Sequence, residues 1–198
     1  MSPNIVLPRI LGALFYYSPE RSEVKALFDC LPNLSELYPW SDPAGTASLC
    51  ADWPFPDNDE LAWQFSVLFE GQGEMPVPPW GSVWLERDNL LMGNTTAEYR
   101  AFLQSQGMTF NSGQNEPEDQ FGLMLLACSA ILDAGKDAAV NQLLEVYLLP
   151  WGYRYLERLQ CNVMSPFYAR LAVVTMRYLQ DVQQQRALKP AVKRLYFG

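Results

Sequence analysis

The segment 115–132, NEPEDQFGLMLLACSAIL, most restricts how this chain can fold. It opens with three acids around a proline, and the residues from Phe121 onward are almost all apolar. Pro117 suits the first turn of a helix, where its missing N–H group costs nothing, and Asn115 or Glu116 can cap that turn. A helix that is apolar on every side is a buried helix. The segment therefore predicts a central core helix whose acidic N-terminus reaches the surface.

The three acids of this segment, Glu116, Glu118 and Asp119, allow two interpretations. Negative charge near a helix N-terminus is stabilised by the helix dipole, and capping accounts well for one or two acids. Three acids around a proline exceed what capping needs, so a site for a cationic partner is the alternative. Both interpretations remain open at this point.

The composition predicts a well-packed globular protein with an uneven charge. Hydrophobic residues make up 49% of the 198 residues and include ten Phe, ten Tyr and six Trp, enough for a substantial core. The net charge of −8 disfavours nucleic acid and anionic membrane surfaces as partners. Residues 1–137 carry 19 acidic and 6 basic side chains (net −13), whereas residues 138–198 carry 3 and 8 (net +5). A basic ligand is therefore expected at the N-terminal two-thirds.

Several functional classes are disfavoured by what the sequence lacks. It contains no histidine, which removes the commonest general base and the commonest metal ligand. It also has no phosphate-binding, dinucleotide-binding or paired-cysteine motif. We therefore predict no catalytic residue, no metal and no cofactor. Because we find no export signal, no apolar run that could insert into a membrane and no disulfide-like cysteine spacing, we expect a cytoplasmic protein.

Helical periodicity runs through nearly the whole chain. We expect an irregular connection over residues 39–57, with at most a helical turn near Ser48, and a basic, irregular arm over 187–198. The fold class is all-α, a single globular domain of eight to ten helices that spans residues 1–198. The other expected helices cover 8–17, 22–31, 57–71, 97–106, 138–149, 151–161 and 166–185.

The segment 71–93, GQGEMPVPPWGSVWLERDNLLMG, is aromatic and apolar yet rich in glycine and proline. These residues exclude a long helix before Ser82. Tryptophans anchor ligands in grooves, and prolines hold such a loop in shape at low entropic cost. Trp80 and Trp84 therefore either line a binding groove or fill the core, and both interpretations remain open.

Several motifs together resemble the TorD/DmsD family of redox-enzyme maturation chaperones, and within it the DmsD-like branch. The match extends over essentially the whole chain, and PPWGSVWL combined with NEPEDxFG is its most specific part. The motifs are ILGALFYYSPE (10–20), LFEG (68–71), PPWGSVWLERDNLLMG (78–93), QNEPEDQFG (114–122), LLPW (148–151) and SPFY (165–168).

The resemblance implies an all-helical chaperone with no enzymatic activity. Such proteins bind the twin-arginine signal peptide of a molybdoenzyme precursor, typically the catalytic subunit of a DMSO reductase-type enzyme, and hold back Tat export until cofactor insertion is complete. Gln120 replaces the usual histidine of the family and cannot titrate near neutral pH. Phe65 is the aromatic residue three positions before Leu68, and Trp63 lies two places earlier. The implied peptide-binding residues are Tyr16, Phe65, Leu68, Phe69, Pro79, Trp80, Trp84, Glu116, Pro117, Asp119 and Gln120.

A twin-arginine signal offers two guanidinium groups followed by an apolar segment. Carboxylates can hold the arginines by charge-assisted hydrogen bonds, and a groove of tryptophan, proline and leucine can cover the apolar part. The resemblance also admits the Tat translocase and the molybdenum-cofactor machinery as partners. A monomer is expected, with a segment-swapped dimer as the alternative. Two other functions stay open: a nucleotide-binding regulator, and a module that holds the apoenzyme without recognising the signal peptide.

Overall fold

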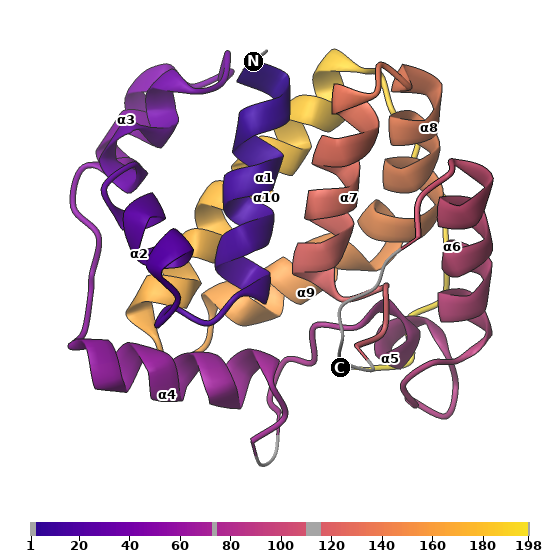
Figure 1. Cartoon of the computed structure of the whole chain (residues 1–198), viewed down its shortest axis with the longest axis horizontal. Helices are drawn as coiled ribbons and strands as arrows, with labels where there is room; N and C mark the ends of the chain where they lie inside the picture. The colour runs from indigo at the N-terminus through magenta and orange to yellow at the C-terminus, as the bar shows by residue number, and fades with distance from the viewer. Residues whose placement is uncertain (1–2, 73–74, 110–115, 198) are drawn as a thin grey trace.

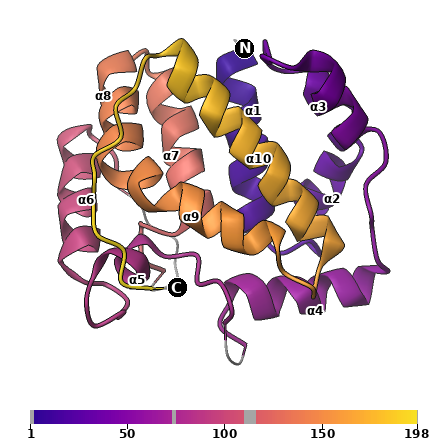
Figure 2. The same cartoon turned by 180° about the vertical axis from the view of Figure 1, so that it is seen from behind.

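The computed structural model describes residues 3–72, 75–109 and 116–197, and these residues form helices and connections without a β-strand. The predicted all-α class is thereby confirmed. At the centre, α1 (Pro3–Tyr16) and α7 (Phe121–Asp133) lie side by side, and α9 and α10 form a layer on their far side (Figures 1 and 2). The other elements are α2 (Ser22–Phe28), η1 (Leu31–Glu36, a 3₁₀ helix), α3 (Pro43–Cys50), α4 (Asn58–Phe69), α5 (Gly81–Leu85), α6 (Asn94–Ser105), α8 (Asp137–Gln142), η2 (Leu143–Leu148, a π-helix), α9 (Leu149–Gln160) and α10 (Pro166–Gln185).

The central helices α1 and α7 meet backbone to backbone. A Cβ atom on Gly12 would lie 2.7 Å from the carbonyl oxygen of Gly122, and a Cβ atom on Gly122 would lie 2.7 Å from that of Gly12. Only glycine fits at both positions, because any side chain would force the two backbones apart. This close approach leaves most of α7 buried, as the sequence predicts.

Helix α7 begins later than the sequence predicts. Its first residue is Phe121, and the side chain of Gln120 caps it by accepting a hydrogen bond from the backbone N–H of Leu123 at 2.9 Å. Pro117 and the acids therefore lie in the turn before the helix, and Glu116 is not the cap. The alternative cap, Asn115, lies outside the described residues.

A distant loop keeps this acidic turn out of the helix. The backbone N–H of Phe121 donates to the carbonyl of Pro79 at 2.8 Å, and that of Gly81 donates to the carbonyl of Asp119 at 3.0 Å. The two segments thus form one isolated antiparallel bridge, between Trp80 and Gln120. The acidic turn is fixed in place because backbone groups at its end pair with residues about forty positions earlier in the chain.

Local capping signals explain several other helix boundaries. Asp57 and Ser165 cap α4 and α10 as expected, each accepting a hydrogen bond from a backbone N–H three residues later. An eight-residue helix, α3, occupies part of the connection where at most a turn was expected. Asp42 caps it, with Pro43 at its start, a combination typical of helix beginnings.

The helical path from α8 through η2 to α9 is uninterrupted, although a break was expected at Pro150. Pro150 lies instead at the start of α9, where its missing N–H group is tolerated. The π-helical turn η2 precedes it, and the chain changes direction along this stretch (Figure 2). A π-helical turn and a proline are both common causes of a helix bend.

Beyond α10 the chain continues as an arm, residues 188–197, which runs past α8 and α6 to α5 (Figure 2). The backbone N–H of Ala191 donates to the carbonyl of Glu145, and that of Tyr196 donates to the carbonyl of Trp84, both at 2.8 Å. The arm is irregular and basic, in agreement with the prediction.

A chain of aromatic rings crosses the core from α4 to this arm. Successive ring centroids lie between 4.9 and 6.4 Å apart, in edge-to-face or stacked geometries that stabilise aromatic pairs. The rings are, in order, Phe69, Phe15, Phe121, Trp151, Trp84 and Phe197.

The four cysteines are all free thiols, two of them buried. Burial raises the pKa of Cys128 to about 12, so this thiol stays protonated and behaves as a small apolar residue. In the part of the chain that the structure describes, no helix has the length and apolarity to cross a membrane.

Candidate functional site

Asp119 organises the acidic turn from inside the protein. Its Oδ2 atom accepts hydrogen bonds from the backbone N–H of Ser82 at 2.6 Å and from the hydroxyl of Thr96 at 3.0 Å. The residue is only 3% exposed. Burial raises the pKa of Asp119, and the hydrogen bonds from Ser82 and Thr96 oppose that rise. Asp119 therefore ties the turn to α5 and α6 instead of presenting its charge to solvent.

Glu116 is half-buried and paired with a tryptophan of the 71–93 segment. The indole Nε1–H of Trp80 donates to Glu116 Oε1 at 2.6 Å. Burial raises the pKa of Glu116, the Trp80 hydrogen bond lowers it, and the nearby charges of Asp119 and Glu70 raise it further. The structure thus joins two residues that the sequence singled out separately.

Glu118 faces a different direction and is held by an arginine. Arg100 on α6 binds it with both arms of its guanidinium group, at 2.6 and 2.8 Å. Burial raises the pKa of Glu118, but the hydrogen bonds and charge of Arg100 outweigh this, so that pKa lies below its ordinary value. The side chain of Arg100 is 46% exposed and that of Glu118 only 14%. The carboxylate of Glu118 is therefore ionised and shielded from solvent, while about half of the Arg100 side chain is in contact with solvent.

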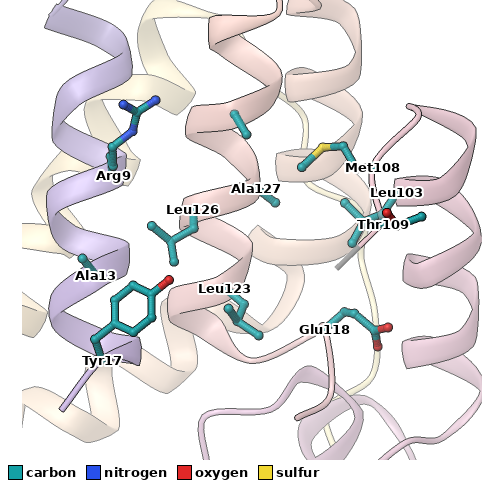
Figure 3. A pocket seen from close by; sticks show the side chains of 11 residues that line it. Arg9, Ala13, Tyr17, Leu103, Met108, Thr109, Glu118, Leu123, Leu126 and Ala127 are labelled. Carbon is teal, nitrogen blue, oxygen red and sulfur yellow. The ribbon is translucent and has the colours of Figure 1, made fainter. Parts of the chain in front are cut away.

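An apolar pocket of about 410 Å³ opens beside Glu118, between α1, α6 and α7 (Figure 3). Arg9 also lines it, and its guanidinium group lies 3.7 Å from the carboxylate of Asp133. The sequence motifs did not predict this pocket. Four of its residues recur on one face of α7 at helical spacing, a pattern that buried core residues show equally. The lining residues are Arg9, Ala13, Tyr17, Leu103, Met108, Thr109, Glu118, Leu123, Leu126, Ala127 and Ala130.

The predicted residues of α4 lie in the core. Phe65, Leu68 and Phe69 are all buried, and the Phe69 ring packs against Phe15 and Tyr168. At most 4% of the surface of each of these three side chains is exposed in the structure. Their part in peptide binding stays a prediction.

Trp84 also lies in the core, which favours the second of the two interpretations for this residue. It is completely buried, and its Nε1–H donates to the carbonyl of Pro78 at 2.8 Å. Its indole stacks on Trp151, with centroids 6.4 Å apart, and meets the ring of Phe197 from the arm. Trp80 is also buried, with 8% of its surface exposed, and belongs to the same core cluster, with its polar edge on Glu116.

The remaining predicted residues gather around the start of α7. The Gln120 side chain donates from Nε2 to the carbonyl of Phe15 at 3.1 Å while it caps α7, so it joins the two central helices. Pro79 and Pro117 are buried on either side of the antiparallel bridge. Tyr16 is half-buried at the end of α1, and its ring lies 4.8 Å from that of Tyr17, which lines the pocket.

The chemistry that this arrangement offers is non-covalent. Over the described residues, no group of three acidic or cysteine side chains is placed to hold a metal ion. The pocket has apolar walls, with the shielded carboxylate of Glu118 and the guanidinium group of Arg9, which lies near Asp133, at its edge. Such a site suits an apolar ligand that carries a cationic end, because apolar surface supplies affinity and a few placed charges supply orientation.

Comparison with known proteins finds relatives over nearly the whole chain. The family described as nitrate reductase delta subunit matches residues 41–157. The Tat proofreading chaperone DmsD of Salmonella typhi is 36% identical over 192 residues, covering 96% of this chain and 94% of that protein. The chaperone protein YcdY of Escherichia coli is 30% identical and covers 88% and 91%. A solved structure described as a redox enzyme maturation protein from Archaeoglobus fulgidus shares the fold, with a TM-score of 0.59 at 14% identity over 89% of this chain and 93% of that one.

Proposed function

The chain belongs to the TorD/DmsD family, and we propose that it is a cytoplasmic chaperone, without enzymatic activity, for a twin-arginine signal peptide. The client is the precursor of a molybdoenzyme of the DMSO reductase type, and binding holds back its export until the cofactor is inserted. Relatives that are named as chaperones, one of them for Tat proofreading, support this proposal.

One observation carries the proposal: a shielded carboxylate, that of Glu118, stands at the edge of an apolar pocket. A twin-arginine signal peptide presents guanidinium groups directly before an apolar segment, so both of its parts find a partner here. Arg100 already shows that Glu118 accepts a guanidinium group in bidentate geometry. An arginine of the signal peptide would take the place of Arg100, which can move into solvent.

The two kinds of contact make different contributions. Apolar area removed from water contributes roughly 25 cal/mol per Å², so the apolar segment of the peptide gains affinity in proportion to the area that it buries in the pocket. A shielded charge-assisted hydrogen bond contributes about 1.5–3 kcal/mol before the loss of Arg100 is subtracted. The acids therefore fix the register of the signal peptide and distinguish it from other apolar segments.

The predicted residues divide into contacting and supporting roles under this proposal. Glu116, with Trp80 bonded to it, offers a second carboxylate for the other arginine. Asp119 and Gln120 position the acidic turn through their bonds to Ser82 and Phe15. This assignment moves the direct contact with arginine from Asp119 to Glu118.

Calorimetric titration with two synthetic peptides tests the proposal. One peptide carries two adjacent arginines before an apolar segment, and the other has both arginines replaced by glutamine. We expect at least about tenfold tighter binding of the arginine peptide, from a difference of about 1.4 kcal/mol or more. Equal affinity for the two peptides would refute the role of the acids, and no binding of either would refute the function.

An exposed apolar tip supports the second candidate, contact with the folded client. Leu90, Leu91 and Met92 are 63%, 48% and 49% exposed in the connection between α5 and α6. Asn89 and Met92 both have positive φ there, a conformation uncommon outside glycine. This contact would be identified if the chain binds a precursor without its signal peptide and loses that binding when Leu90 and Leu91 are changed to serine. Calorimetric titration with a nucleotide tests the alternative function of a nucleotide-binding regulator.

A further inference from the structure

The arm 188–197 has the alternating pattern of an extended segment. Lys193, Leu195 and Phe197 face the protein and are half-buried, whereas Val192, Arg194 and Tyr196 point outward and are exposed. Side chains of an extended chain alternate in this way because the backbone repeats every two residues. The arm thus presents to the body of the protein a cation followed by two apolar side chains.

Lys193 of the arm and Asp119 of the acidic turn line the same small cavity of about 10 Å³, together with Gly81 and Trp151. The Oδ1 atom of Asp119 has no hydrogen-bond partner among the described residues, although the residue is 3% exposed. The ammonium group of Lys193 lies 5.9 Å from the ring centre of Tyr147. The arm therefore packs against the cavity that Asp119 also lines.

Phe197 covers the tryptophan that the family resemblance implicates in peptide binding. Its ring lies 4.9 Å from that of Trp84, and the backbone N–H of Tyr196 donates to the carbonyl of Trp84. With the arm in place, Trp84 has no exposed surface. Access to this indole from the arm side requires the arm to leave.

The acidic turn therefore has two sides with related chemistry. On one side Glu118 meets Arg100 at the edge of the open pocket. On the other side residues 193–197 cover Trp84, with Lys193, Leu195 and Phe197 facing the protein and Arg194 and Tyr196 facing solvent. The docked segment thus offers one cation followed by two apolar side chains, which is the order of charge and apolar surface in a signal peptide.

We propose that residues 193–197 act as an internal ligand, which occupies the Asp119–Trp84 side of the signal-peptide site and is displaced when a signal peptide binds. This inference rests on the proposed function. The arm is suited to displacement because every second residue is exposed, so few of its contacts are shielded from water. The hydrogen bonds of Ala191 and Tyr196 join its backbone to the body of the protein.

Occupancy of the site by the arm lowers the apparent affinity for a signal peptide. The measured dissociation constant equals the intrinsic one divided by the fraction of molecules with the site open. If the arm is docked in about nine molecules of ten, its release tightens binding by about tenfold. The arm would then select for signal peptides that bind more strongly than the chain's own segment.

Titration of three variants with the arginine peptide tests this proposal. Phe197→Ala and Lys193→Ala weaken the docked arm, so we expect each to bind the peptide about three- to tenfold more tightly than the unmodified protein. Val192→Ala is the matched control, because this side chain lies on the same arm and is fully exposed. We expect it to leave the affinity unchanged.

The outcomes separate this inference from the proposed function. If all variants bind the peptide as tightly as the unmodified protein does, the internal ligand is refuted and peptide binding stands. If neither the unmodified protein nor any variant binds the peptide, both are refuted.

Hydrogen exchange on the unmodified protein provides a test that needs no substitution. The amides of Ala191 and Tyr196 should exchange at least several-fold faster with saturating arginine peptide, while those of the α7 core do not change. Equal or slower exchange of the two arm amides would overturn the displacement.

Discussion

The ion pair between Glu118 and Arg100 allows a test in which its two members have opposite effects. Glu118→Gln keeps the size of the side chain and removes the charge that would hold an arginine of the signal peptide. Arg100→Gln removes the residue that competes for Glu118. We expect the first change to weaken peptide binding and the second to strengthen it, whereas a purely structural pair would give effects of the same sign.

The magnitudes follow from exposure. Glu118 is 14% exposed, so its shielded bonds to a peptide arginine are worth about 1.5–3 kcal/mol. Arg100 is 46% exposed, and releasing it costs at most about 1 kcal/mol. The difference is about 0.5–2 kcal/mol, so Glu118→Gln should weaken binding by about 2- to 30-fold. Arg100→Gln should tighten binding by about two- to fivefold.

Calorimetric titration with the arginine peptide measures both changes, and thermal unfolding checks that each variant folds. Each substitution should lower the free energy of unfolding by less than about 1 kcal/mol, because the pair is partly exposed. Glu157→Gln is a matched control, since Glu157 also pairs with an exposed arginine, Arg154, but on α9. Unchanged affinity in Glu118→Gln, or weaker binding in Arg100→Gln, would contradict the assigned role of Glu118.

Three further predictions address packing and protonation. Gly122→Ala should lower the free energy of unfolding by about 1–3 kcal/mol in denaturant titrations, because its Cβ would lie 2.7 Å from a carbonyl oxygen of α1. Trp84→Ala should cost about 3–5 kcal/mol by the same measurement, since the indole is fully buried. Trp80→Phe keeps most of the buried apolar volume and removes the hydrogen bond to Glu116, so it should cost less, about 1–2 kcal/mol, and weaken peptide binding. A stability loss as large as that of Trp84→Ala would argue against separate roles. Burial raises the pKa of Glu116, so peptide affinity should fall on acidification from neutral pH as this acid takes up a proton, and Glu116→Gln should remove that dependence. Because the pKa of Glu116 is higher in the folded than in the unfolded state, its protonation stabilises the folded state at pH values below the unfolded-state pKa. This stabilisation is lost as the pH rises through the folded-state pKa. Glutamine resembles the protonated acid, so Glu116→Gln should raise the unfolding temperature more at pH 7 than in acid.

Helix positions could be predicted wherever the signal is local. Asp57 and Ser165 cap their helices through backbone groups three residues away, and glycines with positive φ follow α4 and α7 at Gly71 and Gly135. The start of α7 was predicted wrongly because the acidic turn pairs with Pro79 and the residues beside it, and nothing near the turn in sequence encodes that pairing. A helix at α3 was missed although its capping signal is present.

The individual roles of the acids could not be read from the sequence. Motif and charge identified the acidic turn as a group, but the partner of each acid comes from another part of the chain. Glu116 meets a tryptophan of the loop before α5, whereas Glu118 and Asp119 meet different residues of α6. The three acids lie within one short turn, and only the fold decides which partner each of them meets.

The aromatic chain through the core has a spectroscopic consequence. The indoles of Trp84 and Trp151 lie 6.4 Å apart at an interplanar angle of 26°, held rigidly in an asymmetric environment that includes the Phe197 ring. Fixed packing of this kind produces near-ultraviolet circular dichroism, which is lost when the packing loosens. The near-ultraviolet circular dichroism of the tryptophans should therefore change when the Phe197 ring leaves Trp84. Displacement of Phe197 can then be followed by circular dichroism, without a label, during titration with the arginine peptide.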